Sequence, residues 1–301
     1  AGNLVRLGLG CIEPAYRTSV EVRNMLFNYG LRSSHKLGRP TISVGNLVTG
    51  GTGKTPVVIE LARRFEAMNI RAAVLLRGYR TGPSGSDEAL ELAEELGPKV
   101  PIEANPDRVA GSRHVIAAHP DVEVFLLDDG FQHRQVHRDL DLVLIDAHRP
   151  FGFDRVLPRG LLREPAANLS RADAVIVTRA DRVPPNDLAH VDQAIAHLTG
   201  QLPLAHAAHR WLGYRDHNDQ HHRSDVLRQA RVLGVCGLAQ PDTFEQTLRE
   251  EVQMVKRSIV LADHHQYTRD QVWRILEEAH AIGCDAAVTS EKDWVKWRSF
   301  L

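Results

Sequence analysis

Short apolar runs alternate with amphipathic segments through the first two thirds of the chain. Runs rich in β-branched residues predict strands, and apolar residues three or four positions apart predict helices. Because strands that alternate with helices pair in parallel, the pattern predicts an α/β domain with a mostly parallel sheet and helices on both faces. The predicted strands are 41–44, 72–76, 122–127, 140–145 and 174–177, and the predicted helices are 56–68, 87–96 and 107–118.

A polar stretch at residues 206–228 separates this domain, residues 1–205, from a second one. The stretch has no sustained period, so we interpret it as a linker or a pair of exposed strands. Its histidines match no strong metal-ligand spacing. Beyond it, strands at 231–235, 258–261 and 286–289 and helices at 243–255 and 269–282 predict a smaller C-terminal α/β domain, 229–301.

The N-terminal segment has its own pattern. Val22, Met25, Leu26 and Tyr29 form an apolar stripe at helical spacing, and residues 1–40 hold six basic but two acidic side chains. Such a basic amphipathic helix can rest on an anionic membrane surface. It can also pack on the domain behind it, which the pattern alone favours because most amphipathic helices serve cores.

Composition narrows the function classes. The chain has 301 residues, with 37 Lys and Arg against 38 Asp and Glu, and a net charge of −1 argues against a general nucleic-acid binder. The three cysteines lie far apart and form no CxxC pair, so neither a zinc site nor a disulfide framework is indicated and a reducing compartment fits. We expect no signal peptide and no transmembrane helix, because no long apolar run is present.

A glycine-rich segment follows the first strand and precedes the first helix of the domain, which is the context of a phosphate-binding P-loop. Glycines let the backbone N–H groups turn toward phosphate oxygens. Lys54 is predicted to reach the β- and γ-phosphates and the Thr55 hydroxyl to bind Mg²⁺. The strict pattern fails at Val48, where it requires glycine. The predicted nucleotide-binding residues are Gly50, Gly51, Thr52, Gly53, Lys54 and Thr55.

Acidic residues at strand and helix ends are the next candidates. Asp128 and Asp129 follow an apolar strand, where a carboxylate can hold Mg²⁺, and Asp146 ends the next strand as a weaker candidate. The pair 87–88 opens a helix, and as a local signal it favours a helix cap. The sequence 263–265, Asp-His-His, taken alone favours a capped turn, although a histidine beside a carboxylate can tune a base.

Residues 178–181, Thr-Arg-Ala-Asp, keep an alternative open. They resemble the guanine-reading loop of P-loop GTPases, usually Asn-Lys-x-Asp, with substitutions at the first two positions. A P-loop GTPase or a nucleotide-driven switch or chaperone is therefore the second hypothesis, in which Asp181 would read guanine.

Taken in order, the motifs resemble one family, the tetraacyldisaccharide 4'-kinases of lipid A biosynthesis. The DDGFQH string weighs most, because generic P-loop proteins lack it. The matching stretches are SVGNL (43–47), GGTGKTP (50–56), RGY (77–79), DE (87–88), DDGFQH (128–133), RDL (138–140), PFG (150–152), LP (157–158), LREP (162–165), RADA (171–174), ADH (262–264) and TSEKD (289–293).

The resemblance implies transfer of the ATP γ-phosphate to the 4'-hydroxyl of a lipid A disaccharide 1-phosphate. It assigns Asp87 as the base, His264 as the residue that orients it and Lys54 to catalysis. Mg²⁺ would be held by Thr55 and Glu88, with support from Asp128 and Asp129. Arginines suit an anionic substrate, and the candidates are Arg77, Arg108, Arg159 and Arg163.

The resemblance also implies where the protein works. The N-terminal helix would contact the inner membrane, so residues 3–31 are expected at its cytoplasmic face as a peripheral attachment. The cofactors implied are ATP and Mg²⁺, and the partner is the lipid substrate; neither nucleic acid nor a protein partner is indicated. Between the two hypotheses, the imperfect 178–181 motif and the intact family string both favour the kinase.

Overall fold

The computed structural model describes residues 2–78, 87–208, 210–211, 213–218, 220–238, 241–263 and 265–301, with side chains except those of 2–11 and Asp87. The chain forms two compact units, Ala1–His209 and Arg210–Leu301. The second unit therefore begins within the polar stretch 206–228.

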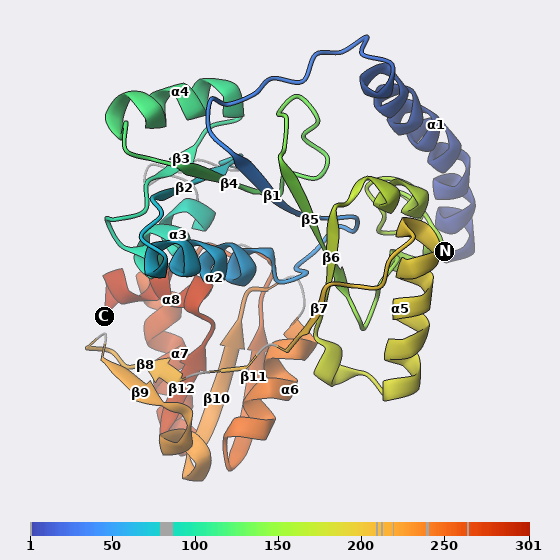
Figure 1. Cartoon of the computed structure of the whole chain (residues 1–301). Coiled ribbons are helices and arrows are strands. Elements are labelled where there is room, and N and C mark those ends of the chain that lie inside the picture. Colours follow the sequence, from blue (N-terminus) through green and yellow to red (C-terminus); the bar gives the residue numbers. More distant parts are fainter. Residues whose placement is uncertain are drawn as a thin grey trace. The chain divides into compact units, whose positions relative to one another are not determined.

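A seven-stranded sheet with parallel pairing is the centre of the first unit (Figure 1). Its central strand pairs on one side with residues 124–128 and on the other with residues 140–146. The predicted α/β class with a mostly parallel sheet is confirmed. In spatial order the strands are β3 (Ile102–Ala104), β2 (Ala72–Leu76), β4 (Val124–Asp128), β1 (Thr41–Asn46), β5 (Leu140–Asp146), β6 (Ala174–Thr178) and β7 (Ala205–Ala207).

Helices cover both faces of this sheet because consecutive side chains of a strand point to opposite sides. In β2, Val74 packs with residues of α2 (Lys54–Ala67) and α3 (Asp87–Leu96), whereas Leu75 packs with Val115 of α4 (Arg108–Ala118). Val191 and Ile195 of α5 (Pro185–Thr199) pack on the second face. The buried strands are apolar almost throughout, as expected for a sheet shielded on both sides.

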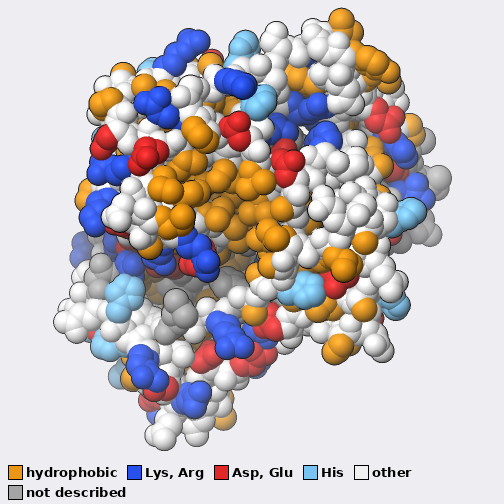
Figure 2. All heavy atoms as spheres, in the orientation of Figure 1, with side chains coloured by type: hydrophobic (Ala, Val, Ile, Leu, Met, Phe, Trp, Pro, Cys, Tyr) orange, Lys and Arg blue, Asp and Glu red, His pale blue; other side chains and the backbone are white. Residues whose placement is uncertain are grey.

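The face of the sheet that carries α2 is only partly shielded from solvent. Hydrophobic side chains gather on it over α2 and the neighbouring strands (Figure 2). Ile42 and Ile176 are partly buried against the cluster beneath α2, and Leu140 at the start of β5 is exposed. The apolar character of the sheet thus extends to the molecular surface here.

The helix α1 (Gly2–Asn28) packs on the rest of the first unit through a face that the sequence pattern did not indicate. Glu13, Val20 and Asn24 are buried, and their spacings of seven and four residues place them on one side of the helix. The predicted apolar stripe points away, since Val22, Met25 and Tyr29 are exposed by 49%, 53% and 75%. In the part of the chain that the structure describes, no helix has both the length and the apolar character to cross a membrane.

The second unit is a smaller α/β arrangement, as predicted. Three parallel strands lie in the order β11 (Met254–Val260), β10 (Arg231–Cys236) and β12 (Ala286–Thr289). Residues 213–223 contribute an antiparallel pair, β8 (Gly213–Arg215) and β9 (His221–Arg223), so the strand alternative for this stretch is the one observed. The helices are α6 (Pro241–Glu251), α7 (Arg269–Ala281) and α8 (Glu291–Trp297).

Candidate active site

The loop between β1 and α2 has the backbone of a phosphate cradle. Gly50 and Gly53 have φ angles of 110° and 83°, in the left-handed region where glycine carries no Cβ penalty. The helix α2 begins at Lys54, so the first N–H groups of the helix and its positive dipole end face the loop. The P-loop predicted at residues 50–55 therefore has the strand–loop–helix setting that phosphate binding requires.

Side chains from the neighbouring strand ends hold this loop from behind. The Thr178 hydroxyl donates to the Thr52 carbonyl at 3.0 Å, and Arg179 Nη2 donates to the Gly51 carbonyl at 2.7 Å. Asn46 Nδ2 donates to Thr52 Oγ1 at 2.8 Å. Protein groups thus satisfy the carbonyls of Gly51 and Thr52 and the hydroxyl of Thr52, which holds the backbone of the loop in place.

These contacts give the Thr-Arg-Ala-Asp motif at residues 178–181 a structural role at the P-loop, which is different from guanine recognition. Its first two residues support the P-loop, and Arg179 also forms an ion pair with Asp146. Asp181 lies near Arg182, with 3.7 Å between Oδ2 and Nε. Asp146, a weaker metal candidate, is therefore the partner of an arginine that holds the loop.

The DDGF part of the family string forms a tight turn against β1. Asp129 has a φ of 53°, so it adopts a left-handed conformation. A Cβ on Gly130 would lie 2.6 Å from the Ser43 hydroxyl, and a Cβ on Gly45 would lie 2.5 Å from the Cβ of Phe131. Both glycines are required by close approach, which fixes the turn beside the P-loop.

Asp129 pairs with two cations. Lys54 Nζ lies 3.4 Å from its Oδ1, and Arg163 Nη1 lies 2.6 Å from its Oδ2. Burial alone would raise the pKa of Asp129, but Lys54 and Arg163 outweigh it and hold the pKa below the usual value. The P-loop lysine, with 14% of its side chain exposed, therefore rests on a carboxylate that stays ionised.

Asp128 has the opposite environment. Burial raises its pKa to about 7 despite Lys54, and the nearby Asp129 and Glu88 charges add to the rise. Its Oδ1 atom is buried without a hydrogen-bond partner. A buried carboxylate with an orphaned oxygen beside other acids fits a divalent cation, which Mg²⁺ sites commonly bind with one or two carboxylates and substrate phosphates. The described residues contain no cluster of three or more His, Cys, Asp or Glu ligands.

A group of basic side chains lies near these acids. Arg108 is 2% exposed, and burial and the nearby Arg77 lower its pKa to about 10, against the opposite effect of the Asp129 and Asp128 charges. Burial, together with Arg108, Arg138 and Arg77, lowers the pKa of His133 to about 4. Buried Arg108 Nε has no partner. A buried guanidinium with an unpartnered Nε suits an anionic group.

The other predicted arginines bind protein groups. Arg163 donates to Asp129, as described, and Arg159 Nη1 lies 3.5 Å from Glu13 Oε2 of α1. Next to Arg163, the fully buried Glu164 accepts hydrogen bonds from four side chains at 2.9–3.0 Å, and these bonds hold the pKa of Glu164 below its usual value against burial. Its donors are Asn24, Gln132, Asn168 and Arg171.

Glu164 connects α1 to the site. Asn24 lies on α1, whereas Gln132 belongs to the turn after β4 and also donates to the Asn46 carbonyl at 2.8 Å. Arg171 lies over the Phe131 ring, 4.4 Å from its centroid. Local patterns did not indicate Gln132, Glu164 or Arg171, which only the family strings contained, and Arg179 was singled out only as part of the 178–181 motif.

The proposed base and its partner lie at the limit of what is described. Asp87 begins α3 but its side chain lies outside the described residues, and His264 lies outside them altogether. The neighbouring Glu88 is described and is close enough to Asp128 and Arg108 to shift both pKa values. The first turn of α3 is therefore at the site, while Thr55 is half-buried in the first turn of α2.

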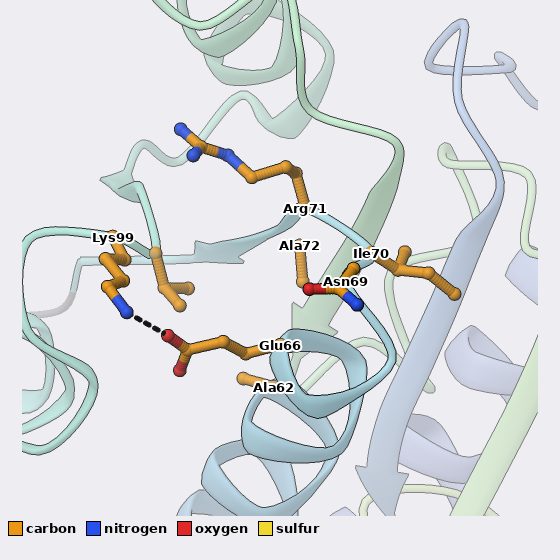
Figure 3. Close-up of a pocket in the computed structure, with 8 residues that line it drawn as sticks. Ala62, Glu66, Asn69, Ile70, Arg71, Ala72 and Lys99 are labelled. Atoms are coloured by element: carbon orange, nitrogen blue, oxygen red, sulfur yellow. Dashed lines mark hydrogen bonds and ion pairs between the residues drawn. The ribbon is translucent and has the colours of Figure 1, made fainter.

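A separate hollow of about 250 Å³ lies beside the amino end of β2 (Figure 3). It lies between the end of α2 and the first residue of β2, and includes Ala62, Ala72 and Val100. Lys99 and Glu66 form an ion pair across it at 2.8 Å. Since the P-loop follows the carboxyl end of β1, this hollow is not part of the candidate site.

Comparison with known proteins gives a consistent result. The family model for tetraacyldisaccharide-1-P 4'-kinase matches residues 6–301. The tetraacyldisaccharide 4'-kinase of Halothermothrix orenii is 32% identical, with 96% of this chain and 82% of the relative covered. That of Geobacter sulfurreducens is 35% identical over 100% of this chain and 87% of the relative. The structure of LpxK from Aquifex aeolicus in complex with ATP has a TM-score of 0.75 and 28% identity, with 98% and 90% covered.

Proposed function

Because the chain belongs to the tetraacyldisaccharide-1-P 4'-kinase family and is an ATP-dependent lipid A 4'-kinase, we propose how its residues divide the work of phosphoryl transfer. The proposal rests on one observation, the contact of Lys54 with Asp129 beside the buried Asp128. This arrangement supports a P-loop lysine that exchanges its carboxylate partner for the β- and γ-phosphates when ATP binds.

The metal site is proposed at Thr55, Glu88 and Asp128, with Asp129 in support. The orphaned Oδ1 of Asp128 and its raised pKa support a cation there, because the bound charge would stabilise the ionised carboxylate. When bound, Mg²⁺ would neutralise charge on the β- and γ-phosphates. Arg77 and Arg108 are proposed to bind substrate phosphate, because Arg108 has an unpartnered buried Nε.

Asp87 is proposed to accept the proton of the 4'-hydroxyl as its oxygen bonds to the γ-phosphorus and the bond to the departing ADP breaks. The position of Glu88 supports this role, because it brings the first turn of α3 to the acidic site. His264 is proposed to orient Asp87, as the family resemblance implies. Little covalent chemistry is required of the protein, so positioning and charge neutralisation account for the rate.

The experiment follows labelled γ-phosphate from ATP, and separately from GTP, to lipid A disaccharide 1-phosphate in mixed micelles, with and without Mg²⁺. We expect Mg²⁺-dependent transfer from ATP, lost in Asp87→Ala and reduced in His264→Ala by about 10²-fold, the scale of general base assistance. Asp121→Ala and His114→Ala are matched controls, because both side chains are exposed. Equal losses in the controls, or full activity in Asp87→Ala, would refute the assignment.

We further propose that α1 attaches the protein peripherally to the cytoplasmic face of the inner membrane. The exposed residues of its stripe, Val22, Met25 and Tyr29, support this, since the opposite face of the helix contacts the domain. Arginines at positions 17, 23 and 32 lie along the same segment and would favour anionic lipid.

Met25→Glu should reduce binding to vesicles of phosphatidylethanolamine and phosphatidylglycerol by about tenfold, because it puts a charge into the proposed lipid-facing stripe. Flotation with vesicles measures the bound fraction. Met68→Glu is the matched control, because Met68 is a 65% exposed methionine at the end of α2. The same binding in both variants would exclude the stripe as the attachment surface.

A further inference from the structure

Arg134 follows the acidic turn at residues 128–133 and binds the end of α1. Its Nη1 donates to the Asn24 carbonyl at 2.9 Å, and its Nη2 donates to Asn28 Oδ1 at 2.8 Å. Its guanidinium also lies over the Phe27 ring, 5.3 Å from the ring centroid. One side chain therefore contacts three residues near the end of α1, two through hydrogen bonds and one through a cation–π contact.

The end of α1 favours a cation at this place. The carbonyl end of a helix carries partial negative charge, and the last turn of α1, Met-Leu-Phe-Asn at residues 25–28, has no basic residue of its own. Burial and the nearby Arg171 and Arg138 charges lower the pKa of Arg134, so its surroundings in the domain disfavour the positive charge. The contacts with α1 offset this cost.

The end of α1 is closed by its own backbone. Gly30 has a φ of 69°, in the left-handed region that is common where helices end. Gly30 N–H donates to the Phe27 carbonyl at 3.1 Å, and Arg32 N–H donates to the Leu26 carbonyl at 3.0 Å. The last turn of α1 therefore gives Arg134 partners in defined positions.

Short backbone bonds connect Arg134 to the acids of the turn. Arg134 N–H donates to the Gln132 carbonyl at 3.1 Å, and His133 N–H donates to the Gly130 carbonyl at 2.8 Å. Gly130 is the neighbour of Asp129 in the sequence, and close approach leaves no room for a side chain there. A displacement of Arg134 would therefore reach Asp129 through the backbone of a tight turn.

The P-loop has supports of its own. Thr178 and Arg179 bind its carbonyls, and Asn46 binds the Thr52 hydroxyl. None of these three supporting residues belongs to α1 or to the turn at 128–133. Loss of the contacts of Arg134 is therefore expected to displace the acids of the turn and to leave the backbone of the P-loop in place.

We infer that Arg134 is a positioning residue for phosphoryl transfer, which sets the place of the 128–133 turn by binding it to the end of α1. The inference rests on the proposed function, because it requires Asp128 and Asp129 to have their proposed roles beside Lys54. Arg134 itself touches neither nucleotide nor lipid in this role.

The test replaces Arg134 by methionine, which keeps an unbranched stem and removes the donors. We expect Arg134→Met to lower kcat for phosphate transfer about tenfold, the scale of one charged hydrogen bond, with the KM for ATP unchanged. Arg134→Lys keeps the charge and should restore most of kcat. Arg39→Met is the matched control and should have full activity, because Arg39 also binds backbone carbonyls of the first unit, those of Gly38, Pro120 and Val122.

Variants of Asn28 identify the route of the effect. Asn28→Ala removes one acceptor of Arg134 and should lower kcat about threefold, whereas Asn28→Asp keeps an acceptor and should have full activity. Because both residues act through one contact, Arg134→Met combined with Asn28→Ala should lose no more than Arg134→Met alone. Losses that multiply, or a raised KM for ATP with unchanged kcat, would overturn the inference.

A readout without turnover completes the test. Hydrogen exchange of the backbone amides, followed by mass spectrometry, should become faster in residues 128–136 of Arg134→Met and Asn28→Ala but not of Arg39→Met. Residues 72–76 of the buried strand β2 are the reference for the fold as a whole. Unchanged exchange at 128–136 in Arg134→Met would overturn the inference. If Lys54→Met kept full activity, the proposed function would fail instead, which is a distinct result.

Discussion

Lys54→Met should lower kcat for phosphate transfer about 10³-fold while the protein stays folded. In the proposed role, the lysine supplies positive charge where negative charge develops in phosphoryl transfer, and loss of one such preorganised group typically costs 10²–10³-fold. The fold should tolerate the change, because Asp129 keeps Arg163 at 2.6 Å as a partner. Transfer of labelled phosphate to the lipid at saturating ATP measures the effect.

Lys99→Met is the control for Lys54→Met, because Lys99 forms an exposed ion pair with Glu66 near the amino end of β2. Such pairs contribute at most about 1 kcal/mol to stability, and this one lies away from the P-loop. We expect full activity in the control. A Lys54→Met protein with more than a tenth of the normal kcat would show that the P-loop lysine is not the main source of this charge.

Glu164→Gln should lower the free energy of unfolding by about 3–5 kcal/mol, the range for breaking a buried ion pair by removing one partner. The amide would retain one acceptor oxygen and place an NH₂ group among donors from Asn24, Gln132 and Arg171. Arg171 would then lack its carboxylate partner while only 17% of its side chain is exposed. Urea unfolding, followed by circular dichroism, measures the change.

The control for this variant is Glu60→Gln, which removes an exposed pair with Arg64 and should cost less than about 1 kcal/mol. The difference in free energy of unfolding between the wild type and Glu164→Gln should also depend on pH. Since the folded pKa of Glu164 is lowered from 4.5, its contribution is present above that value and is lost as pH falls through the folded pKa. A variant as stable as Glu60→Gln at neutral pH would show that the buried network contributes little.

Much of the fold follows from hydrophobic pattern, because buried parallel strands are almost continuously apolar. The prediction for β2, residues 72–76, agrees with the structure, and helix 87–96 agrees with α3. The short strands β3 and β7, with three residues each, were missed, because their pairing partners rather than their own residues specify them. The helix α8 was also missed, since seven residues give too little periodicity.

The candidate site was predictable where chemistry depends on neighbours in the chain. The glycines and Lys54 of the P-loop, and the acids after β4, could be read from local spacing. The roles of Arg179 and Glu164 could not, because each depends on partners distant in sequence: Gly51 for Arg179 and Asn24 for Glu164. The 178–181 motif was ambiguous for the same reason.

The N-terminal helix shows the limit of reasoning from amphipathicity. Its apolar stripe favoured packing against the domain, yet the buried side contains Glu13 and Asn24. Polar partners in the domain, such as Glu164 for Asn24 and Arg159 for Glu13, compensate for their burial. The spacing of apolar residues shows which face of a helix is hydrophobic, but it does not show whether that face packs on the protein or faces outward.

The supports behind the P-loop have a thermodynamic consequence. Thr178, Arg179 and Asn46 order the loop during folding, so the conformational entropy of its backbone is lost before any nucleotide arrives. In the proposed role, ATP would meet a loop that is already held in place, and less of its binding free energy would be spent on ordering that loop. On this proposal, selectivity for the triphosphate would come from shape and charge set in advance, with Thr178 and Arg179 as the support of the loop.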